Sequence, residues 1–323
     1  MRFLRVIGSA RSASSLRDHG ILLAVAALVA VLSLSTDTFL TSGNLVNLLD
    51  QAVVAGLLAC GMTLCVICGV FDLSASAVLA VSAIVAVIVT ERAGVPAGYA
   101  AAVITGGLLG TLNGVVVVLS RVHSFIATLA LGIVHRGLAL VIAGGAIVYP
   151  GPARLEEFQS LSWPTVLGGV TASSLLLVAV AVVTSVLLAR TTFGRRVYAV
   201  GGNPSAAWLS GIGVRSVRVG VFAISGICAG LAGLVLAARG GSAQPDMGTL
   251  LELTAIAATV IGGTSILGGR GAIWRGMVGV LILTLIGNGF NLLGWNSTYR
   301  PMVEGLLILG AVSLDHALRH RMD

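Results

Sequence analysis

The absence of one residue type from this sequence excludes two forms of catalysis. All 19 of its Lys and Arg residues are arginine, so the chain has no lysine. A Walker A loop needs its lysine to bind nucleotide phosphates, and Schiff-base catalysis needs a lysine amine. The chain therefore cannot hydrolyse ATP by the Walker A route, and lysine-dependent catalysis is excluded.

Two further motifs resemble a metal or redox site and a nucleotide-binding loop, but each has a simpler structural interpretation. Cys65 and Cys68 have CxxC spacing within an apolar segment, and without further ligands nearby we interpret them as packing residues rather than a metal or redox site. The glycine-rich segment 262–271 fits no nucleotide-binding pattern, and no strand precedes it. We interpret it as a non-helical turn buried in protein at the cytoplasmic end of a span.

Polar residues inside apolar segments are costly in a membrane and are therefore candidates for function. Asp72 and Ser74 follow one apolar segment and open the next; they suit a helix cap and also a polar hinge lining a central path. The side-chain amides of Asn113, Asn288 and Asn291 suit either hydrogen bonds between helices or the lining of a translocation path. The candidates for the translocation path are Asp72, Ser74, Asn113, Arg136, Asn288 and Asn291.

Arg136 is the most costly of these residues, at roughly 2.5–3.5 kcal/mol in the middle of a helix. We expect it to face the interior of the bundle and to find a partner. Glu304 lies at a similar predicted depth in the last span, so one hypothesis is an Arg136–Glu304 ion pair. The alternative is that backbone carbonyls satisfy Arg136 while Glu304 faces water.

The elements that position these residues are predicted to be membrane-spanning helices. The chain is 57% hydrophobic and only 10% charged, with a mean hydropathy of +1.04, which excludes an ordinary soluble enzyme. Its 43 glycines suit close helix packing in lipid. We predict an all-α polytopic membrane protein with one domain over residues 1–323 and about ten spans. The spans lie near 21–34, 52–69, 74–90, 98–119, 125–142, 166–189, 219–238, 253–267, 276–293 and 301–316, with broken or re-entrant pieces around 52–90 and 253–267.

The distribution of arginine predicts the orientation in the membrane. With the N-terminus inside, only Arg92, Arg154, Arg239 and Arg300 fall outside, and Arg136 lies within a span. Arginine accumulates in cytoplasmic loops, so the net charge of +7 indicates topology rather than nucleic-acid binding. The tail 1–19, both termini and the loop 190–218 are then cytoplasmic. Gln244 and Asp246 fall in an outside loop, where they either contact an extracytoplasmic partner or are simply solvated.

The cytoplasmic loop 190–218 contains the signature of a short helix. Asn203 suits the N-cap, Pro204 the first helical position and Gly211 the residue just past the end. These residues predict a helix of about two turns, which is too short to be stable alone in water. Such a helix indicates a docking point for a soluble partner.

Ordered sequence blocks give the chain a family resemblance. Among them are GMTL at 61–64, SFIATL at 124–129, GRRVYAVGGNP at 194–204 and AIAATVIGGTS at 255–265. Together they are similar to the ribose-type monosaccharide permeases of ABC importers, within the branched-chain amino acid/ribose-type transport permease family. The likeness runs from about Asn44 to Asp315 in unbroken order.

The resemblance implies a homodimeric or paralogous heterodimeric permease in the lipid bilayer of the cytoplasmic (inner) membrane. It also implies two cytoplasmic ABC ATPase subunits, which bind ATP and Mg²⁺, and an extracytoplasmic sugar-binding protein; no cofactor, metal or nucleic acid is implied for this chain. The coupling helix would dock in a groove of the ATPase. The coupling residues are then Gly194, Arg195, Gly202, Asn203, Pro204, Ser205, Ala206, Trp208, Leu209 and Gly211.

The chain departs from the family pattern at several positions. Relatives usually carry an acidic and a basic residue where this chain has Ser205 and Trp208, so the docking surface is expected to be more apolar. Ser76 replaces a usual glycine, and Glu304 stands where basic or neutral residues are commoner.

The function implied is ATP-driven import of a pentose, hexose or related polyol by a non-catalytic subunit. An ion-coupled secondary transporter is the alternative, but it would need carboxylates within spans. Asp72, Glu252, Glu304 and Asp315 all lie at span ends. An intramembrane enzyme lacks a catalytic constellation.

Overall fold

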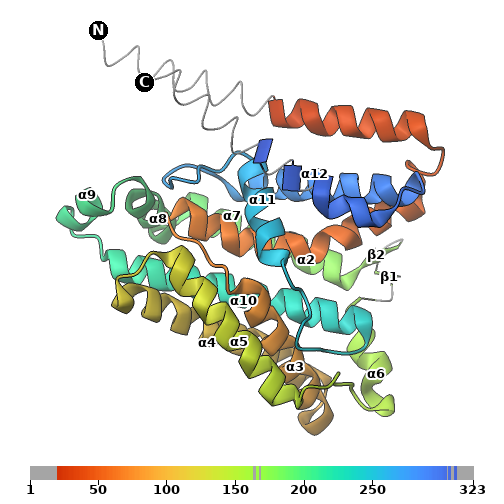
Figure 1. Cartoon of the computed structure of the whole chain (residues 1–323), viewed down its shortest axis with the longest axis horizontal. Coiled ribbons are helices and arrows are strands. Elements are labelled where there is room, and N and C mark those ends of the chain that lie inside the picture. The colour runs from red at the N-terminus through yellow and green to blue at the C-terminus, as the bar shows by residue number, and fades with distance from the viewer. Residues whose placement is uncertain (1–19, 163–164, 167–168, 304, 307–308, 311–323) are drawn as a thin grey trace.

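Long apolar helices account for most of the chain in the computed structural model, which describes residues 20–162, 165–166, 169–303, 305–306 and 309–310 (Figure 1). Among these residues, seven helices are long and apolar enough to cross a membrane. They are α2 (Ser42–Ile67), α3 (Ala75–Ala93), α4 (Val95–Ser120), α5 (Ser124–Ala143), α7 (Ala172–Arg190), α10 (Val214–Gly240) and α12 (Ile273–Leu292).

Two predicted helix breaks are confirmed. The first break is the non-helical segment 68–74, which separates α2 from α3. The second break is the segment 262–272, which follows the short helix α11 (Leu251–Ile261) and precedes α12. Another short apolar helix, Gly20–Ser35, lies before α2. Most of the predicted last span lies outside the described residues, so the count of about ten spans stays a prediction.

Smaller elements connect the long helices. The helix α6 (Pro152–Gln159) lies in the loop after α5, and it was not expected from the sequence. The strands β1 (Thr165–Val166) and β2 (Val170–Thr171) pair antiparallel. The loop before α10 contains α8 (Thr192–Gly202) and α9 (Pro204–Leu209), and the 3-10 helix η1 (Ser297–Tyr299) follows α12.

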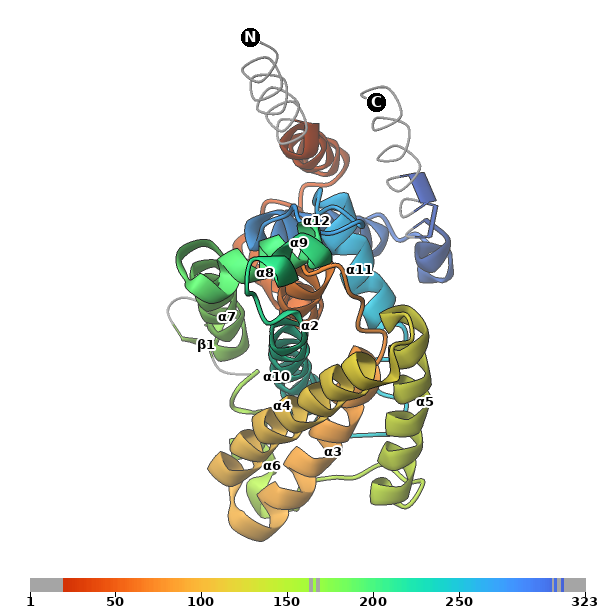
Figure 2. The ribbon, with the colours of Figure 1, turned by 90° about the vertical axis from the view of Figure 1, so that its left-hand side faces the viewer.

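Burial separates inner from outer helices. In the most apolar stretch of each helix, 83% of the residues of α2 are buried but only 22% of those of α5 and 28% of those of α7. Figure 2 shows α2 and α10 near the middle, with α7 and α5 on opposite sides. Apolar side chains exposed along α5 and α7 suit contact with lipid, where they need no partner.

Glycines allow α4 and α10 to cross at backbone contact. Gly106 and Gly110 on α4 face Gly226 and Gly230 on α10. A Cβ atom at Gly226 would stand 2.7 Å from the Cα of Gly110 and would overlap the carbonyl oxygen of Gly106. Small residues at such spacing let helices pack closely in lipid, as the glycine content predicted.

We expect Gly226→Ala to destabilise the protein by about 1–3 kcal/mol, because the helices must separate to admit the methyl group. The thermal unfolding midpoint of the purified protein in detergent measures this effect. Gly137→Ala on α5 is the matched control, since its Cβ would meet no atom within 4 Å. Equal thermal unfolding midpoints for Gly226→Ala and Gly137→Ala would contradict the close backbone contact between α4 and α10.

Candidate functional site

The short helix predicted in the loop 190–218 is confirmed as α9. Its N-cap Asn203 accepts a hydrogen bond at Oδ1 from the backbone N–H of Ala206 (2.9 Å), and Pro204 occupies the first turn. Gly211 follows the end of the helix with φ +79°, in the left-handed region that favours glycine. Local residues therefore fix both ends of α9.

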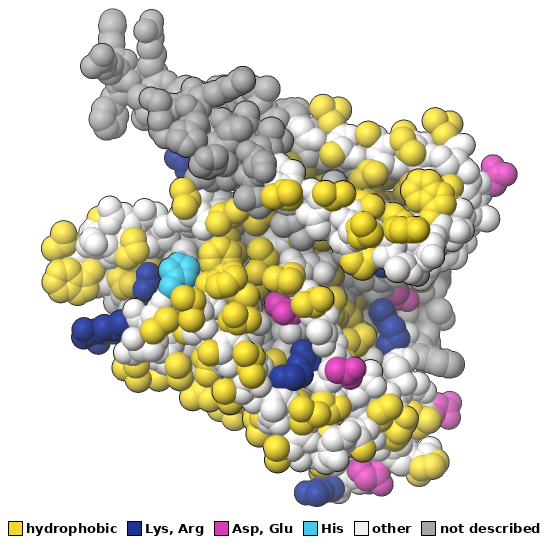
Figure 3. All heavy atoms as spheres, viewed as in Figure 1, with side chains coloured by type: hydrophobic (Ala, Val, Ile, Leu, Met, Phe, Trp, Pro, Cys, Tyr) yellow, Lys and Arg dark blue, Asp and Glu magenta, His cyan; other side chains and the backbone are white. Residues whose placement is uncertain are grey.

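The outer surface of α9 is apolar. The side chains of Trp208 and Leu209 are 69% and 78% exposed, whereas Ala207 is buried. In Figure 3, hydrophobic side chains gather at the projecting tip that α9 forms at the left edge. On α8, Arg195 and Arg196 are also exposed. An apolar tip beside basic side chains is typical of a surface that binds another protein.

The other side of α8 packs on both helix breaks through a backbone contact of five glycines. We call this the glycine contact, and its members are Gly69, Gly201, Gly202, Gly268 and Gly269. The backbone N–H of Gly269 also donates to the carbonyl oxygen of Ile67, at the end of α2 (2.8 Å). A Cβ atom at Gly201 would overlap that same oxygen. A movement of α8 must therefore displace both helix breaks or separate from them.

Tyr198 strengthens this attachment. Its hydroxyl donates a hydrogen bond to the carbonyl oxygen of Gly271 in the second break (2.8 Å). Burial raises the pKa of the Tyr198 phenol above its usual value, so it remains protonated as a donor. Val197 and Val200 are fully buried beside it on α8. The helix α8 is thus joined to the bundle by packing and by a hydrogen bond.

A buried polar network begins in the first helix break. The carboxylate of Asp72 is inaccessible to solvent and accepts hydrogen bonds from the Ser74 backbone N–H (3.2 Å), the Ser74 hydroxyl and the Ser225 hydroxyl on α10 (2.8 Å). The Asn113 amide on α4 donates to the Ser74 hydroxyl (2.7 Å). His135 on α5 completes the network, with its Nε2 atom 2.7 Å from Asn113 Oδ1.

The structure brings together three of the predicted path residues, Asp72, Ser74 and Asn113. It also adds His135 and Ser225, to which the sequence analysis gave no role in the path. The cost of a histidine within a span was the available signal for His135. The predicted cap position is confirmed, because Ser74 is the N-cap residue of α3. Its side chain makes no capping hydrogen bond; its hydroxyl instead donates to Asp72 and accepts from the Asn113 amide.

Side chains of α5 satisfy the backbone of the first break. The Ser124 hydroxyl accepts a hydrogen bond from the Phe71 N–H (3.1 Å), and the Thr128 hydroxyl accepts one from the Leu73 N–H (3.0 Å). Non-helical backbone at membrane depth requires such partners, since lipid supplies none. The non-helical backbone of the first break is therefore stabilised by specific side chains of α5.

We expect Asp72→Ala to destabilise the bundle by roughly 3 kcal/mol, because it leaves two buried hydroxyls and one N–H without their acceptor. Asp72→Asn should cost less, since the amide oxygen still accepts and the hydroxyls can rotate. Urea or thermal unfolding of detergent-solubilised protein gives the comparison. If the asparagine variant were no more stable than the alanine variant, hydrogen bonding would not be the role of Asp72.

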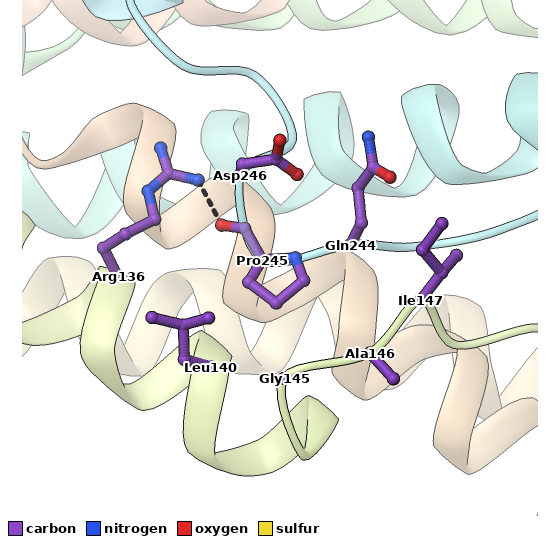
Figure 4. A pocket seen from close by; sticks show the side chains of 8 residues that line it. All are labelled: Arg136, Leu140, Gly145, Ala146, Ile147, Gln244, Pro245 and Asp246. Carbon is purple, nitrogen blue, oxygen red and sulfur yellow. Dashed lines mark hydrogen bonds between the residues drawn. The ribbon is translucent and has the colours of Figure 1, made fainter.

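Arg136 is satisfied by backbone carbonyls, one of the two alternatives predicted. Its Nη1 donates to the carbonyl oxygens of Pro245 (2.5 Å) and Met247 (3.0 Å), in the segment between α10 and α11 (Figure 4). Its Nη2 donates to the hydroxyl of Ser76 on α3 (3.4 Å). Glu304, the other proposed partner, lies outside the described residues.

A cavity of about 310 Å³ lies beside Arg136. It is lined by residues of α5, the loop after α5 and the loop before α11, and it contains both residues predicted to contact a binding protein. Its lining residues are Arg136, Leu140, Gly145, Ala146, Ile147, Gln244, Pro245 and Asp246.

The remaining two path candidates lie elsewhere. Asn288 on α12 exchanges hydrogen bonds with Asn44 on α2, with Asn288 Nδ2 donating to Asn44 Oδ1 (2.8 Å) and Asn44 Nδ2 donating to Asn288 Oδ1 (3.2 Å). Asn288 therefore joins two helices. Asn291 is exposed near the end of α12. Neither amide contacts the polar network through any described hydrogen bond.

Comparison with known proteins identifies the class. The family described as "branched-chain amino acid transport system / permease component" matches residues 44–312, and the chain belongs to this family. The chain is 38% identical to the ribose import permease protein of Escherichia coli (strain K12) over 305 residues, which are 93% of this chain and 94% of that protein. The ribose import permease protein of Bacillus subtilis (strain 168) is 41% identical over 289 residues, 89% of each chain.

The D-allose transport system permease protein of Escherichia coli (strain K12) is 38% identical over 304 residues, covering 93% of this chain and 92% of that protein. No solved structure matches the chain.

Proposed function

We propose that this chain is the membrane-spanning permease subunit of an ATP-driven ABC importer and that it carries a monosaccharide or related polyol inward. The observation that carries the ATP-driven part is α9, a capped helix with an exposed apolar tip beside the basic α8. The sugar cargo is supported by relatives named for ribose and D-allose, and by one named for L-arabinose in Azospirillum brasilense.

The partners follow from this assignment. Separate cytoplasmic subunits bind ATP and Mg²⁺ and hydrolyse the nucleotide, so this chain is a non-catalytic subunit. An extracytoplasmic binding protein delivers the sugar, and a second permease subunit, identical or paralogous, completes the membrane core. Both termini and the loop 190–218 face the cytoplasm, because arginine favours that side.

The mechanism begins at α9. Closure of the ATPase dimer pushes on the docked helix, and α8 carries the movement through the glycine contact to both helix breaks. The first break then changes its position relative to α4, α5 and α10, to which the polar network joins it by hydrogen bonds. The bundle alternates between outward-open and inward-open states because nucleotide and delivered sugar each bind one of them better.

Uptake of labelled sugar into proteoliposomes containing the complete importer tests the proposal. We expect uptake to require internal ATP, the ATPase and the binding protein, and to survive a protonophore and a sodium ionophore. The ion-coupled alternative requires the opposite result. Membership of a transport-system permease family argues against the ion-coupled alternative. The carboxylate of Asp72 also already accepts hydrogen bonds from buried donors, which disfavours a role in binding a coupling ion.

A further inference from the structure

The cavity beside Arg136 has the size and position of a small-molecule site. Its volume of about 310 Å³ is at the lower end of the range of roughly 300–1,000 Å³ for ligand pockets. This volume has room for one sugar ring. Gly145–Ile147 and Gln244–Asp246, which form much of its wall, belong to loops that the arginine distribution places outside.

Polar groups with free capacity line this cavity. Two carbonyl oxygens hold Nη1 of Arg136, which fixes the guanidinium plane and leaves Nε–H without a partner among the described residues. Neither the carboxylate of Asp246 nor the side-chain amide of Gln244 makes a hydrogen bond with any described residue. In Figure 4 the polar ends of these three side chains lie along one edge of the cavity.

The rest of the lining suits the carbon face of a sugar. Leu140, Ile147 and Pro245 contribute apolar surface, while Arg136, Asp246 and Gln244 together offer planar donors, a charged acceptor and an amide. Vicinal hydroxyls can donate to a carboxylate and accept from a guanidinium, and such charge-assisted hydrogen bonds are the strong ones.

The charges favour a neutral ligand. Arg136 and Asp246 are the two charged side chains of the lining, so the lining carries no net charge. A sugar phosphate or sugar acid would bring a negative charge that this lining does not balance. A neutral polyol meets no such cost.

We propose that this cavity, the outer sugar site, binds a neutral monosaccharide within the permease itself, between release from the binding protein and passage inward. Arg136 and Asp246 bind adjacent hydroxyls, and Gln244 binds a third. The inference rests on the proposed import function and locates a sugar-recognition step in this chain. It is an alternative to the sequence-based prediction that Gln244 and Asp246 contact the binding protein, and the two are separated by the second measurement below.

Ligand-detected saturation-transfer NMR on the purified permease–ATPase complex in nanodiscs, without binding protein, tests the proposal. The probes are D-ribose, D-allose, L-arabinose and ribose 5-phosphate. We expect saturable binding of at least one neutral sugar and weaker or no binding of the phosphate. Asp246→Asn and Gln244→Ala should each raise the dissociation constant about tenfold. Glu156→Gln, at an exposed residue of α6, should leave it unchanged.

A second measurement separates the site from a docking role. Half-saturation of ATPase stimulation by the sugar-loaded binding protein should be the same for Gln244→Ala and wild type. A raised half-saturation with unchanged sugar binding would show instead that the residue contacts the binding protein. Absence of saturable binding by all three neutral sugars, or preference for the phosphate, would also overturn the proposal. If ATP-driven uptake by the wild type persists in that case, the proposed function stands and only the outer sugar site falls.

Discussion

Replacing Trp208 by aspartate is expected to reduce ATP-driven sugar uptake to the level of vesicles that lack the ATPase. The Trp208 side chain is 69% exposed on α9, and a buried tryptophan at a protein interface commonly contributes about 2 kcal/mol or more. Its loss weakens ATPase binding about thirtyfold, and a carboxylate placed in an apolar groove adds a desolvation cost. Uptake and co-purification of the ATPase with the permease measure the effect.

Ser205→Asp is the matched control for this variant. It adds the same charge to the same helix, at an exposed position in its first turn. An acidic group near a helix N-terminus is also electrostatically favourable. Uptake by the Ser205→Asp variant should remain close to that of the wild type. Equal loss in both variants would show that negative charge, rather than loss of the apolar contact, disrupts docking.

Gly201→Ala is expected to lower uptake about tenfold or more while the ATPase subunits remain bound. The added methyl group overlaps the carbonyl oxygen of Ile67, so α8 must separate from the first helix break. Overpacking of this kind costs about 1–3 kcal/mol. A similar rise in the barrier to the conformational change accounts for the loss of rate. ATP hydrolysis should continue without matching sugar uptake.

Gly137→Ala is the control, at a glycine outside the glycine contact. Its added Cβ would meet no atom within 4 Å, so Gly137→Ala should transport normally. The ratio of ATP hydrolysed to sugar taken up is the decisive quantity. An unchanged ratio in Gly201→Ala protein of normal thermal stability would remove the glycine contact from the coupling route.

The features predicted correctly were those that neighbouring residues determine. The ends of α9 depend on Asn203, Pro204 and Gly211, all within the same short segment. The two helix breaks follow from interrupted apolar runs that contain glycine or a charged residue. In each case a local cost of helix formation is visible in the sequence.

The features missed depend on contacts between distant segments. Arg136 donates to Pro245 and Met247, more than 100 residues later, and no periodicity in the sequence indicates that approach. The sequence context of Asn288 suits both an interhelical and a path role, and its pairing with Asn44 favours the first. The helix α6 was missed because its polar side chains and flanking proline are also typical of a loop.

Photocrosslinking from position 208 tests the account most directly, because the central claim is that α9 docks on a cytoplasmic ATPase. All four native cysteines are buried, so a benzophenone maleimide should label Trp208→Cys selectively. Tyr149→Cys is the control, at a residue 63% exposed in a loop assigned to the opposite side. We predict a crosslink to the ATPase from position 208 and none from position 149. Crosslinking from position 149, or from neither position in a complex active in uptake, would contradict the account.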